Sequence, residues 1–258
     1  MSLIYSDLTN FKGIVQIAEK EMGFNRGDIS GDVNKLKEFT ADVNLAMDDF
    51  FTIALKASGT WQFDDSNHTK YPFILINLAS GQRDYSFTVD EQGNLILDIY
   101  KVMVADSSGF YKEINPVDQQ SANTIDTNLN SFIDGRNTAG IPTRYDKTAN
   151  GIFLDPVPNY NATNGLKVFI NREGSYFVYT DTTKTPGVPG LFHRYFVIKP
   201  SFDYARRNNL TIAPRLADEV LQFEGDESKG IVGSIERYFG RRERDIKRIL
   251  KANVENTR

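Results

Sequence analysis

The sequence predicts an α+β protein in which a helical bundle, built from both chain ends, carries an inserted antiparallel β-sandwich or small barrel. Apolar residues recur at helical spacing near both ends. Between them, short runs rich in Tyr, Phe, Val and Ile alternate with turn residues, most regularly over residues 140–174. We therefore expect a helical domain over residues 1–59 and 181–240, a β domain over 60–180, and a basic tail over 241–258.

Two helices are expected before the β domain. The first is short, because its apolar stripe ends at Met22 and Gly23 follows as a stop. The second begins after the capping residues Ser30-Gly31-Asp32 and ends near Ser58-Gly59. Its apolar stripe, wide enough to pack against other helices, consists of Leu36, Phe39, Val43, Ala46, Met47, Phe50, Ala54 and Leu55.

The β domain begins at Trp61, where the composition changes. Residues 115–137 are polar and are interpreted as a long surface loop. After residue 137, the last strand is expected over Tyr176–Thr180. The strands expected before the loop are Phe73–Leu78, Tyr85–Val89, Leu95–Val104 and Phe110–Ile114.

Residues 140–174 predict two successive antiparallel strands. An apolar run over Ile152–Leu154 stops at Asp155-Pro156-Val157-Pro158, because proline cannot donate a backbone hydrogen bond to a neighbouring strand. Asn164-Gly165 is typical of a tight turn. The following strand is expected to have one buried face, formed by Leu166, Val168 and Ile170, with Lys167 and Asn171 on the other.

The chain is expected to return to helix after a linker over residues 182–190. One helix covers Leu191–Asn208, with Pro200 expected to kink or break it. Another begins near Pro214, because proline suits the first turn of a helix. Its continuation is weakened by three glycines, Gly225, Gly230 and Gly233.

Composition limits the kind of protein. The 258 residues contain no cysteine, which excludes disulfides, thiolate nucleophiles and cysteine-ligated metals. The first residues do not have the basic start and apolar core of a signal peptide, and no apolar run approaches the ~18 residues that span a bilayer. We expect a cytosolic or assembly-bound product without a membrane partner.

The charge is unevenly distributed. Residues 241–258 hold seven basic and three acidic side chains, whereas the whole chain has a net charge of −4. An acidic body with a basic tail favours a tail that meets an acidic partner, either protein or nucleic acid. The alternative is a solvated helical end, since short charge runs usually face solvent.

Sequence motifs of nucleophilic catalysis, zinc binding and nucleotide binding are absent. No G-x-S-x-G, H-E-x-x-H, G-x-x-x-x-G-K-[ST] or G-x-G-x-x-G occurs. Of the two histidines, His193 lies in a helical pattern and is expected to be structural, and His68 lies among polar turn residues and is expected at the surface. We therefore expect neither an enzyme nor a cofactor.

One segment has the spacing that opens a calcium loop. Asp126, Asn128 and Asn130 alternate in the required way. However, the sixth position is Ser131, where glycine is required, and the twelfth is Asn137, where a glutamate should stand. We therefore expect no calcium site.

Two pairs of acids, Asp48-Asp49 and Asp64-Asp65, could supply carboxylates for glycoside hydrolysis. Adjacent acids on a strand point to opposite faces, and such pairs are common on protein surfaces. We expect them to be non-catalytic.

An ordered set of structural motifs runs from about residue 30 to about residue 240. In this order, the motifs and their helical flanks resemble the head-to-tail connector proteins of tailed bacteriophages, the adaptor or neck-ring proteins beneath the portal. The motifs are Trp61, Tyr71-Pro72, Gly81-Gln82-Arg83-Asp84-Tyr85, Leu95–Val104, Phe110–Ile114, Gly140-Ile141-Pro142-Thr143-Arg144-Tyr145, Ile152–Pro158, the Leu166 strand, Phe192-His193 and Tyr204-Ala205.

The resemblance implies a non-enzymatic virion protein, assembled in the bacterial cytoplasm, that forms a ring of identical subunits, commonly twelve. The ring would stack on the portal protein, bind tail or further neck proteins, and surround the DNA channel. In such adaptors the C-terminal extension grips the portal, which would give the basic tail its partner. The portal-binding residues expected on this basis are Arg241, Arg242, Arg244, Ile246, Lys247, Arg248 and Ile249.

The acidic body would suit a channel through which DNA slides without sequence-specific binding, because contacts that neutralise phosphates would retard it.

A binding module is the alternative function. Most of the twelve tyrosines lie in the β part. With Trp61 they could form the glycan-binding face of a tail-associated or extracellular β-sandwich, or they could simply fill strand positions where an amphipathic ring is favoured.

Overall fold

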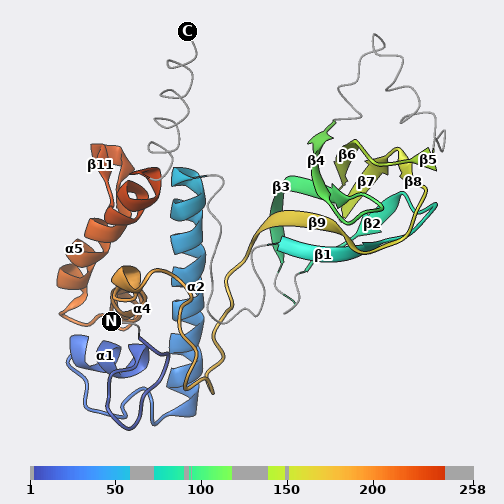
Figure 1. Ribbon diagram of the computed structural model, residues 1–258. Helices are drawn as coiled ribbons and strands as arrows, with labels where there is room; N and C mark the ends of the chain where they lie inside the picture. Colours follow the sequence, from blue (N-terminus) through green and yellow to red (C-terminus); the bar gives the residue numbers. More distant parts are fainter. Residues whose placement is uncertain are drawn as a thin grey trace. The chain divides into compact units, whose positions relative to one another are not determined.

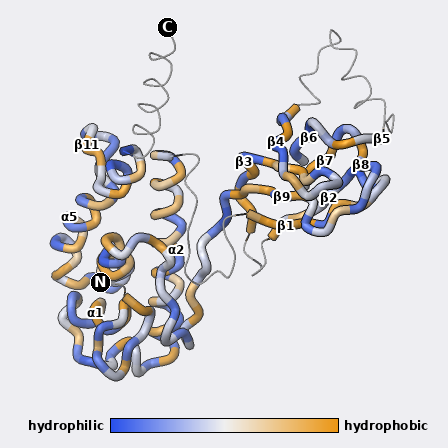
Figure 2. The backbone as a smooth tube through the Cα atoms, in the orientation of Figure 1, coloured by the Kyte–Doolittle hydropathy of each residue, from blue (hydrophilic) through white to orange (hydrophobic). Residues whose placement is uncertain are grey.

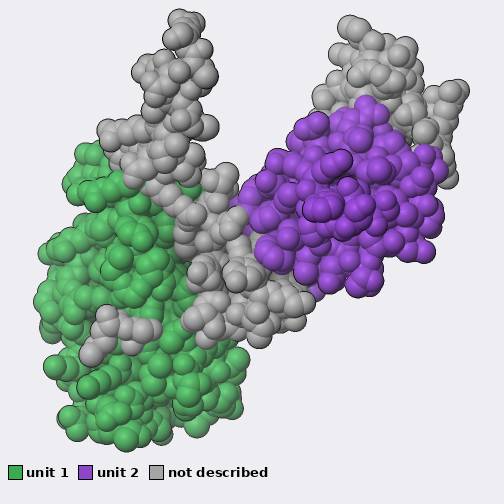
Figure 3. Space-filling model, viewed as in Figure 1, with its two compact units in different colours: residues 1–69, 174–258 green, residues 70–173 purple. Residues whose placement is uncertain are grey.

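In this computed structural model the chain forms two compact units. The first, the helical unit, comprises residues 1–69 and 174–258, and the second, the β unit, comprises residues 70–173 (Figure 3). The α+β class expected from the sequence is confirmed, with helices from both chain ends and a curled seven-stranded sheet (Figure 1). The residues described are 3–58, 73–89, 93, 95–117, 139–148 and 151–241.

In the helical unit, α4 lies between α2 and α5 (Figure 1) and also packs against α1. The first and last parts of the chain therefore share one core. The named helices are α1 (Ile14–Glu21), α2 (Val33–Ala57), the 3-10 turn η1 (Gly190–Phe192), α4 (Tyr195–Arg207) and α5 (Ala213–Glu224), and residues 234–241 are also helical.

Local sequence explains where these helices begin and end. The side chain of Asp32 accepts hydrogen bonds from the backbone N–H groups of Asn34 and Lys35, and so caps the start of α2. Proline stands in the first turn of α5, and Gly225 ends that helix with a φ of 87°, a conformation that favours glycine. Pro200 lies inside α4 and does not end it, contrary to the break that was one of the two expectations.

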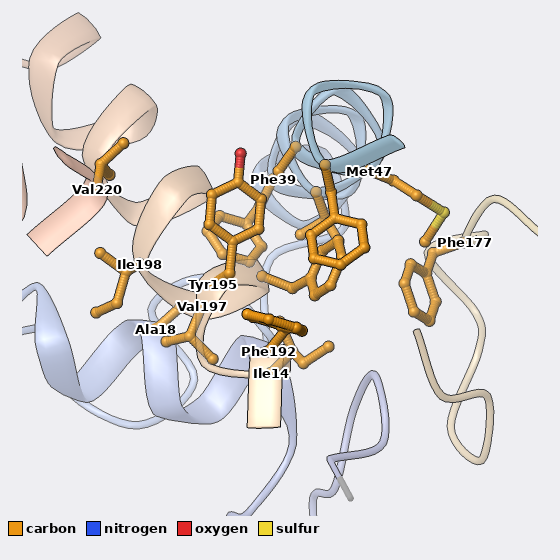
Figure 4. Close-up of a cluster of buried hydrophobic side chains, with 14 of the residues drawn as sticks. Ile14, Ala18, Phe39, Met47, Phe177, Phe192, Tyr195, Val197, Ile198 and Val220 are labelled. Carbon is orange, nitrogen blue, oxygen red and sulfur yellow. The ribbon is translucent and has the colours of Figure 1, made fainter. Parts of the chain in front are cut away.

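Aromatic side chains fill the core of the helical unit. Phe50 of α2 contacts the rings of Phe192, Tyr195, Phe196 and Phe239 at centroid distances of 5.5–6.0 Å. Figure 4 shows how side chains from α1, α2 and α4 meet in this cluster. Because both chain ends contribute, neither end buries its apolar stripe alone.

A buried carboxylate fixes the connection between α1 and α2. Glu19 is 1% exposed. Its Oε1 accepts hydrogen bonds from the N–H groups of Ile29 (2.9 Å) and Ser30 (2.7 Å), and its Oε2 accepts one from Gly27 (3.2 Å). These bonds satisfy backbone donors that the turn leaves without helical partners.

The β unit contains a sheet with the strand order β1-β9-β3-β4-β6-β7-β2, in which β4 and β6 are parallel and the other pairs antiparallel. β5 and β8 form a separate parallel pair. The strands are β1 (Phe73–Leu78), β2 (Asp84–Ser86), β3 (Ile96–Ala105), β4 (Tyr111–Pro116), β5 (Ala139–Gly140), β6 (Arg144–Thr148), β7 (Gly151–Asp155), β8 (Val157–Pro158) and β9 (Ala162–Arg172).

The burial of β9 confirms the expected alternation. Leu166, Val168 and Ile170 are buried, whereas Lys167 is half-buried on the other face. β3 and β9 carry both hydrophobic and hydrophilic residues (Figure 2), and their buried residues include Val102, Val104, Leu166 and Val168. Asn171 is buried, contrary to the expectation of a solvent face, because the alternation ends at the last residues of the strand.

The prediction of a tight turn at Asn164-Gly165 is wrong. Both residues lie inside β9, and the pairing of β9 with β1 shifts register there, because between two paired positions one residue of β1, Asn77, lies opposite three of β9. Asn164 uses its positive φ of 55° in this irregularity, where its N–H donates to Asn77 Oδ1 and its carbonyl accepts from the Tyr111 hydroxyl. The expected pair of successive strands is also wrong, since β7 and β9 are not neighbours in the sheet.

The prediction of a last strand over Tyr176–Thr180 is also wrong. The segment belongs to the helical unit, where the side chain of Asn44 bonds both the N–H and the carbonyl of Phe177. The Phe177 ring stacks on Tyr5 at 4.8 Å. Helix contacts therefore replace the strand pairing that the alternating sequence indicates.

Candidate interaction surface

The candidate surface lies at one end of the helical unit, where residues 234–241 form the last described helix. Ile235 and Phe239 bury this helix in the core, with exposures of 0% and 1%. The Phe239 ring stacks on Phe192 at 6.0 Å. Arg237 and Tyr238, between the two anchors, remain at the surface.

A short hairpin stands beside this helix. It consists of β10 (Gly225–Asp226) and β11 (Ile231–Val232), joined by the 3-10 turn η2 (Glu227–Lys229). Glu227 forms an ion pair with Lys56, and this contact ties the hairpin to the end of α2. Hydrogen bonds from the side chains of Lys229 and Ser228 hold the pKa of Asp226 at about 2, so its carboxylate remains charged near neutral pH.

Two grooves flank the last described helix. The larger, about 690 Å³, is lined by the hairpin and the end of α2. The smaller, about 300 Å³, is lined by the apolar and aromatic residues Leu191, Phe192, Phe223 and Tyr238 and by the polar residues Ser234, Arg237 and Arg241; we call it the arginine-edged groove. Arg237 lines both grooves, so the two adjoin at this side chain.

Large apolar side chains are exposed around these grooves. Leu191 is 59% exposed and Ile231 is 51% exposed, with Val232 and Tyr238 above 40%. Exposed apolar clusters with a polar edge are typical of protein interaction sites. Chemically, the surface can hold an apolar side chain and pair its arginines with carboxylates.

Only one of the expected portal-binding residues lies in the described part of the chain. Arg241 is exposed at the edge of the arginine-edged groove, where it follows the buried anchor Phe239. The other six lie outside the described residues, namely Arg242, Arg244, Ile246, Lys247, Arg248 and Ile249.

Sequence reasoning did not identify the grooves. Leu191 and Tyr238 lie beside the helical apolar stripes rather than on them, and this offset was the available signal. A single large apolar residue off the stripe is common, however, and only the fold brings these two residues together.

The structural role expected for His193 is confirmed. The side chain is 3% exposed, its Nδ1 accepts a hydrogen bond from the Leu3 N–H (2.8 Å), and its Nε2 lies 2.9 Å from the Val188 carbonyl. Burial lowers the pKa of His193, so the neutral ring is favoured. Because both ring nitrogens have backbone partners, the side chain holds the N-terminal segment in place. His68 lies outside the described residues.

A second polar cluster joins three helices. Lys199 of α4 lies 3.1 Å from Asp49, 3.4 Å from Glu224 and 3.8 Å from Asp203. The Tyr195 hydroxyl donates to Glu224, and burial raises the pKa of this tyrosine, which remains protonated. The cluster therefore links α2, α4 and α5 by charge pairing.

Of the other residues considered as site candidates, some lie in the described part of the chain and some do not. Asp48 accepts a hydrogen bond from the Tyr176 hydroxyl and Asp49 pairs with Lys199. Trp61, the acids at 64 and 65, and the segment from 126 to 137 lie outside the described residues. Within the part of the chain that is described, no three His, Asp or Glu side chains are grouped to hold a metal ion.

Tyr85 and Tyr145 are buried in the β unit, with exposures of 2% and 1%. These two tyrosines fill strand positions, which was one of the two interpretations of the tyrosine-rich sequence.

Comparison of the chain with protein family models and with curated proteins gave no match. Across the described helices, none has the length and apolar character required to cross a bilayer.

Proposed function

We propose that this chain is a structural subunit of a tailed bacteriophage virion, which forms a homo-oligomeric ring below the portal and joins the head to the tail. The observation that carries the proposal is the apolar surface with an arginine edge at one end of the helical unit. The basic segment 241–258 begins at this surface.

The position of Arg241 supports a role of the tail in binding. Among the described residues Phe239 is the last core anchor, and Arg241, two positions later, is exposed. A portal surface with carboxylates beside apolar side chains would match both the groove and the seven basic residues of the tail. The groove would then seat the apolar part of the partner while the tail supplies the charge.

The separation of the chain into two units also supports the proposal. Each unit has its own buried core, so one can form a ring while the other meets a different partner. A connector needs at least two kinds of contact, with its own copies and with neighbouring components. Two independently packed units supply separate surfaces for them.

The test is removal of residues 241–258, followed by assembly with the portal protein of the same phage. Because Ile235 and Phe239 precede the deletion, circular dichroism should report an intact fold. Docking on purified portal rings, measured by co-sedimentation, should be abolished. A matched variant with the four basic residues Arg242, Arg244, Lys247 and Arg248 changed to Gln should weaken docking without shortening the chain. Unchanged docking of the deleted chain would refute the proposal.

A further inference from the structure

A pocket of about 250 Å³ lies in the β unit at the beginning of β3, and we call it the β3 pocket. Two of its apolar lining residues are open to solvent, Leu95 at 51% exposure and Leu97 at 48%. The two charged side chains of the lining, Asp98 and Lys147, pair with each other at 2.9 Å. The apolar lining residues are Phe87, Leu95, Ile96, Leu97 and Ile99.

The lining of the β3 pocket favours an uncharged, apolar group. A charged group that entered it would lose water against apolar side chains, and Asp98 and Lys147 already neutralise each other. The volume is sufficient for one aromatic ring, since a cavity of about 150 Å³ lined by Leu, Ile and Phe side chains binds benzene. The pocket therefore suits a projecting apolar side chain of the size of a phenyl ring.

The turn between β3 and β4 presents such a side chain. Phe110 is 71% exposed, the largest value among the exposed large apolar side chains of the described residues. The three residues before it, Ser107, Ser108 and Gly109, carry no charge. A single aromatic ring thus projects from an uncharged tip, and aromatic side chains are enriched at the centres of protein interfaces.

Asp106 fixes the conformation of this turn, residues 106–110, which we call the Phe110 turn. Its Oδ1 accepts hydrogen bonds from the N–H groups of Ser108 (2.9 Å) and Phe110 (3.1 Å), and its N–H donates to the Phe110 carbonyl (3.0 Å). Gly109 has a φ of 83°, a conformation that favours glycine. Because the turn is already ordered, burial of the Phe110 ring in a partner would cost little conformational entropy.

The Phe110 turn and the β3 pocket lie at opposite ends of β3. The strand begins at Ile96, which lines the pocket, and ends at Ala105, just before the turn. Leu97 and Ala105 are eight residues apart, which corresponds to about 26 Å along a strand. The Phe110 ring of one copy therefore cannot reach the pocket of the same copy.

A contact between these two sites joins two different copies. Each copy has one Phe110 turn and one β3 pocket, and it can use both at once because they lie at opposite ends of the strand. A contact between two different surfaces of identical subunits is heterologous, and it closes into a ring when the rotation per subunit allows.

We propose that the Phe110 ring of one copy inserts into the β3 pocket of the next copy, against Leu95 and Leu97. The occupant of the pocket is thus a second copy of this chain. This assignment deepens the proposed function and rests on its ring, because it supplies the contact between neighbouring subunits. The candidate interaction surface of the helical unit stays available for the portal.

Because the chain contains no native cysteine, cross-linking of the full-length protein tests the contact directly. In Ser108→Cys/Thr88→Cys, one cysteine lies on the Phe110 turn and the other lines the pocket, and both positions are exposed. A short bis-maleimide should convert this variant into a ladder of covalent oligomers in denaturing gels. The control is Ser108→Cys/Val33→Cys, because Val33 is 54% exposed but belongs to α2 and does not line the pocket. This control should give little product beyond monomer.

Substitutions at the two sites give a second readout. Phe110→Ser removes the ring and Leu97→Lys places a charge in the pocket, and both sites are exposed, so circular dichroism should report folded chains. Each variant alone should associate about 30-fold more weakly than the wild type in analytical ultracentrifugation, the effect expected at the centre of an interface. The control Ile141→Ser should associate like the wild type, because Ile141 is 50% exposed in the same unit but lies neither on the turn nor in the pocket.

Mixing the two defective variants makes the test specific. Phe110→Ser keeps an intact pocket and Leu97→Lys keeps an intact Phe110 turn. An equimolar mixture should therefore form a dimer with one copy of each variant and no larger species.

The outcomes separate this assignment from the proposed ring. A ladder in Ser108→Cys/Thr88→Cys together with a mixed dimer would support the assignment. If the wild type assembles and both defective variants assemble equally well, the assignment is overturned and the ring remains. If the wild type stays monomeric, alone and with portal rings, and gives no ladder, both the assignment and the ring are overturned.

Discussion

Replacing the buried carboxylate of Glu19 tests how the helical unit is held together. In Glu19→Gln the side chain keeps its size, but only one of its terminal atoms can still accept. The N–H of Gly27, which donates to Oε2, would face an amide NH₂ group, whereas Ile29 and Ser30 would keep a neutral acceptor. The connection between α1 and α2 would therefore lose one bond and the charge assistance of the other two.

The magnitude follows from these three bonds. Hydrogen bonds to charged groups contribute about 1.5–3 kcal/mol each, and neutral ones about 0.5–1.5 kcal/mol. One lost bond of about 1.5–3 kcal/mol and two bonds weakened by about 1–1.5 kcal/mol each should together lower the free energy of unfolding of the helical unit by about 3.5–6 kcal/mol in Glu19→Gln. Glu19→Ala leaves all three N–H groups without this acceptor and should cost more.

Urea denaturation followed by far-UV circular dichroism measures this change, because the helical unit supplies most of the helical signal. The matched control is Glu38→Gln, an exposed carboxylate on α2, which should change the free energy by less than about 0.5 kcal/mol. The reasoning would be refuted if Glu19→Gln unfolded at the same urea concentration as the control.

Three further predictions concern single sites. The folded-state pKa of His193 lies below its ordinary value of 6.5. The stabilising contribution of His193 is therefore present above pH 6.5 and is lost as the pH falls through the folded-state pKa. Since His193→Gln removes this titration, the decline in urea midpoint between about pH 7 and about pH 5 should be flatter in this variant than in the wild type. Gly151→Ala would place a Cβ 2.1 Å from the Tyr85 carbonyl oxygen, and it should destabilise the β unit by about 1–3 kcal/mol in thermal unfolding. The control Gly140→Ala should not destabilise the unit, because its added Cβ would have its nearest contact at 3.4 Å. Arg207 forms two hydrogen bonds, of 2.6 and 3.1 Å, with the buried carboxylate of Asp42. Arg207→Ala should therefore lower the free energy of unfolding in urea by about 1–3 kcal/mol, a value reduced by the half exposure of the arginine. A double variant that also carries Asp42→Asn should recover part of this loss, because no buried charge is left unpaired.

Sequence patterns predict those parts of this fold that local chemistry decides. The apolar run Phe73–Leu78 coincides with β1, and the cap at Asp32 and the stripe from Leu36 onward give α2. In β9, alternation identified the buried face, because a period of two has few alternatives in a strand. These elements depend on short-range periodicity and capping.

The errors arise where distant contacts override local signals. Asn164-Gly165 has turn chemistry, but pairing with β1 and β3 keeps the chain extended and uses the positive φ in a register shift. Tyr176–Thr180 alternates like a strand, but Asn44 takes its backbone bonds and Tyr5 takes the Phe177 ring. Sequence spacing gives no information about either partner.

Of the candidate interaction surface, only the basic charge could be predicted from the sequence. The basic residues from Arg241 onward are visible in the sequence, whereas the arginine-edged groove forms from residues before α4, at the end of α5 and in the last described helix. Leu191 and Tyr238 are 47 positions apart, and the packing of Phe192 against Tyr238 and Phe239 brings their neighbourhoods together.

The ring claim is tested most directly by the mass of the chain bound to portal rings, determined by native mass spectrometry. The account predicts that the bound protein has a mass equal to one fixed multiple of 29.2 kDa, twelve if the proposed ring has the copy number common among phage connectors. A chain that remains a free monomer of 29.2 kDa in the presence of portal would contradict the account.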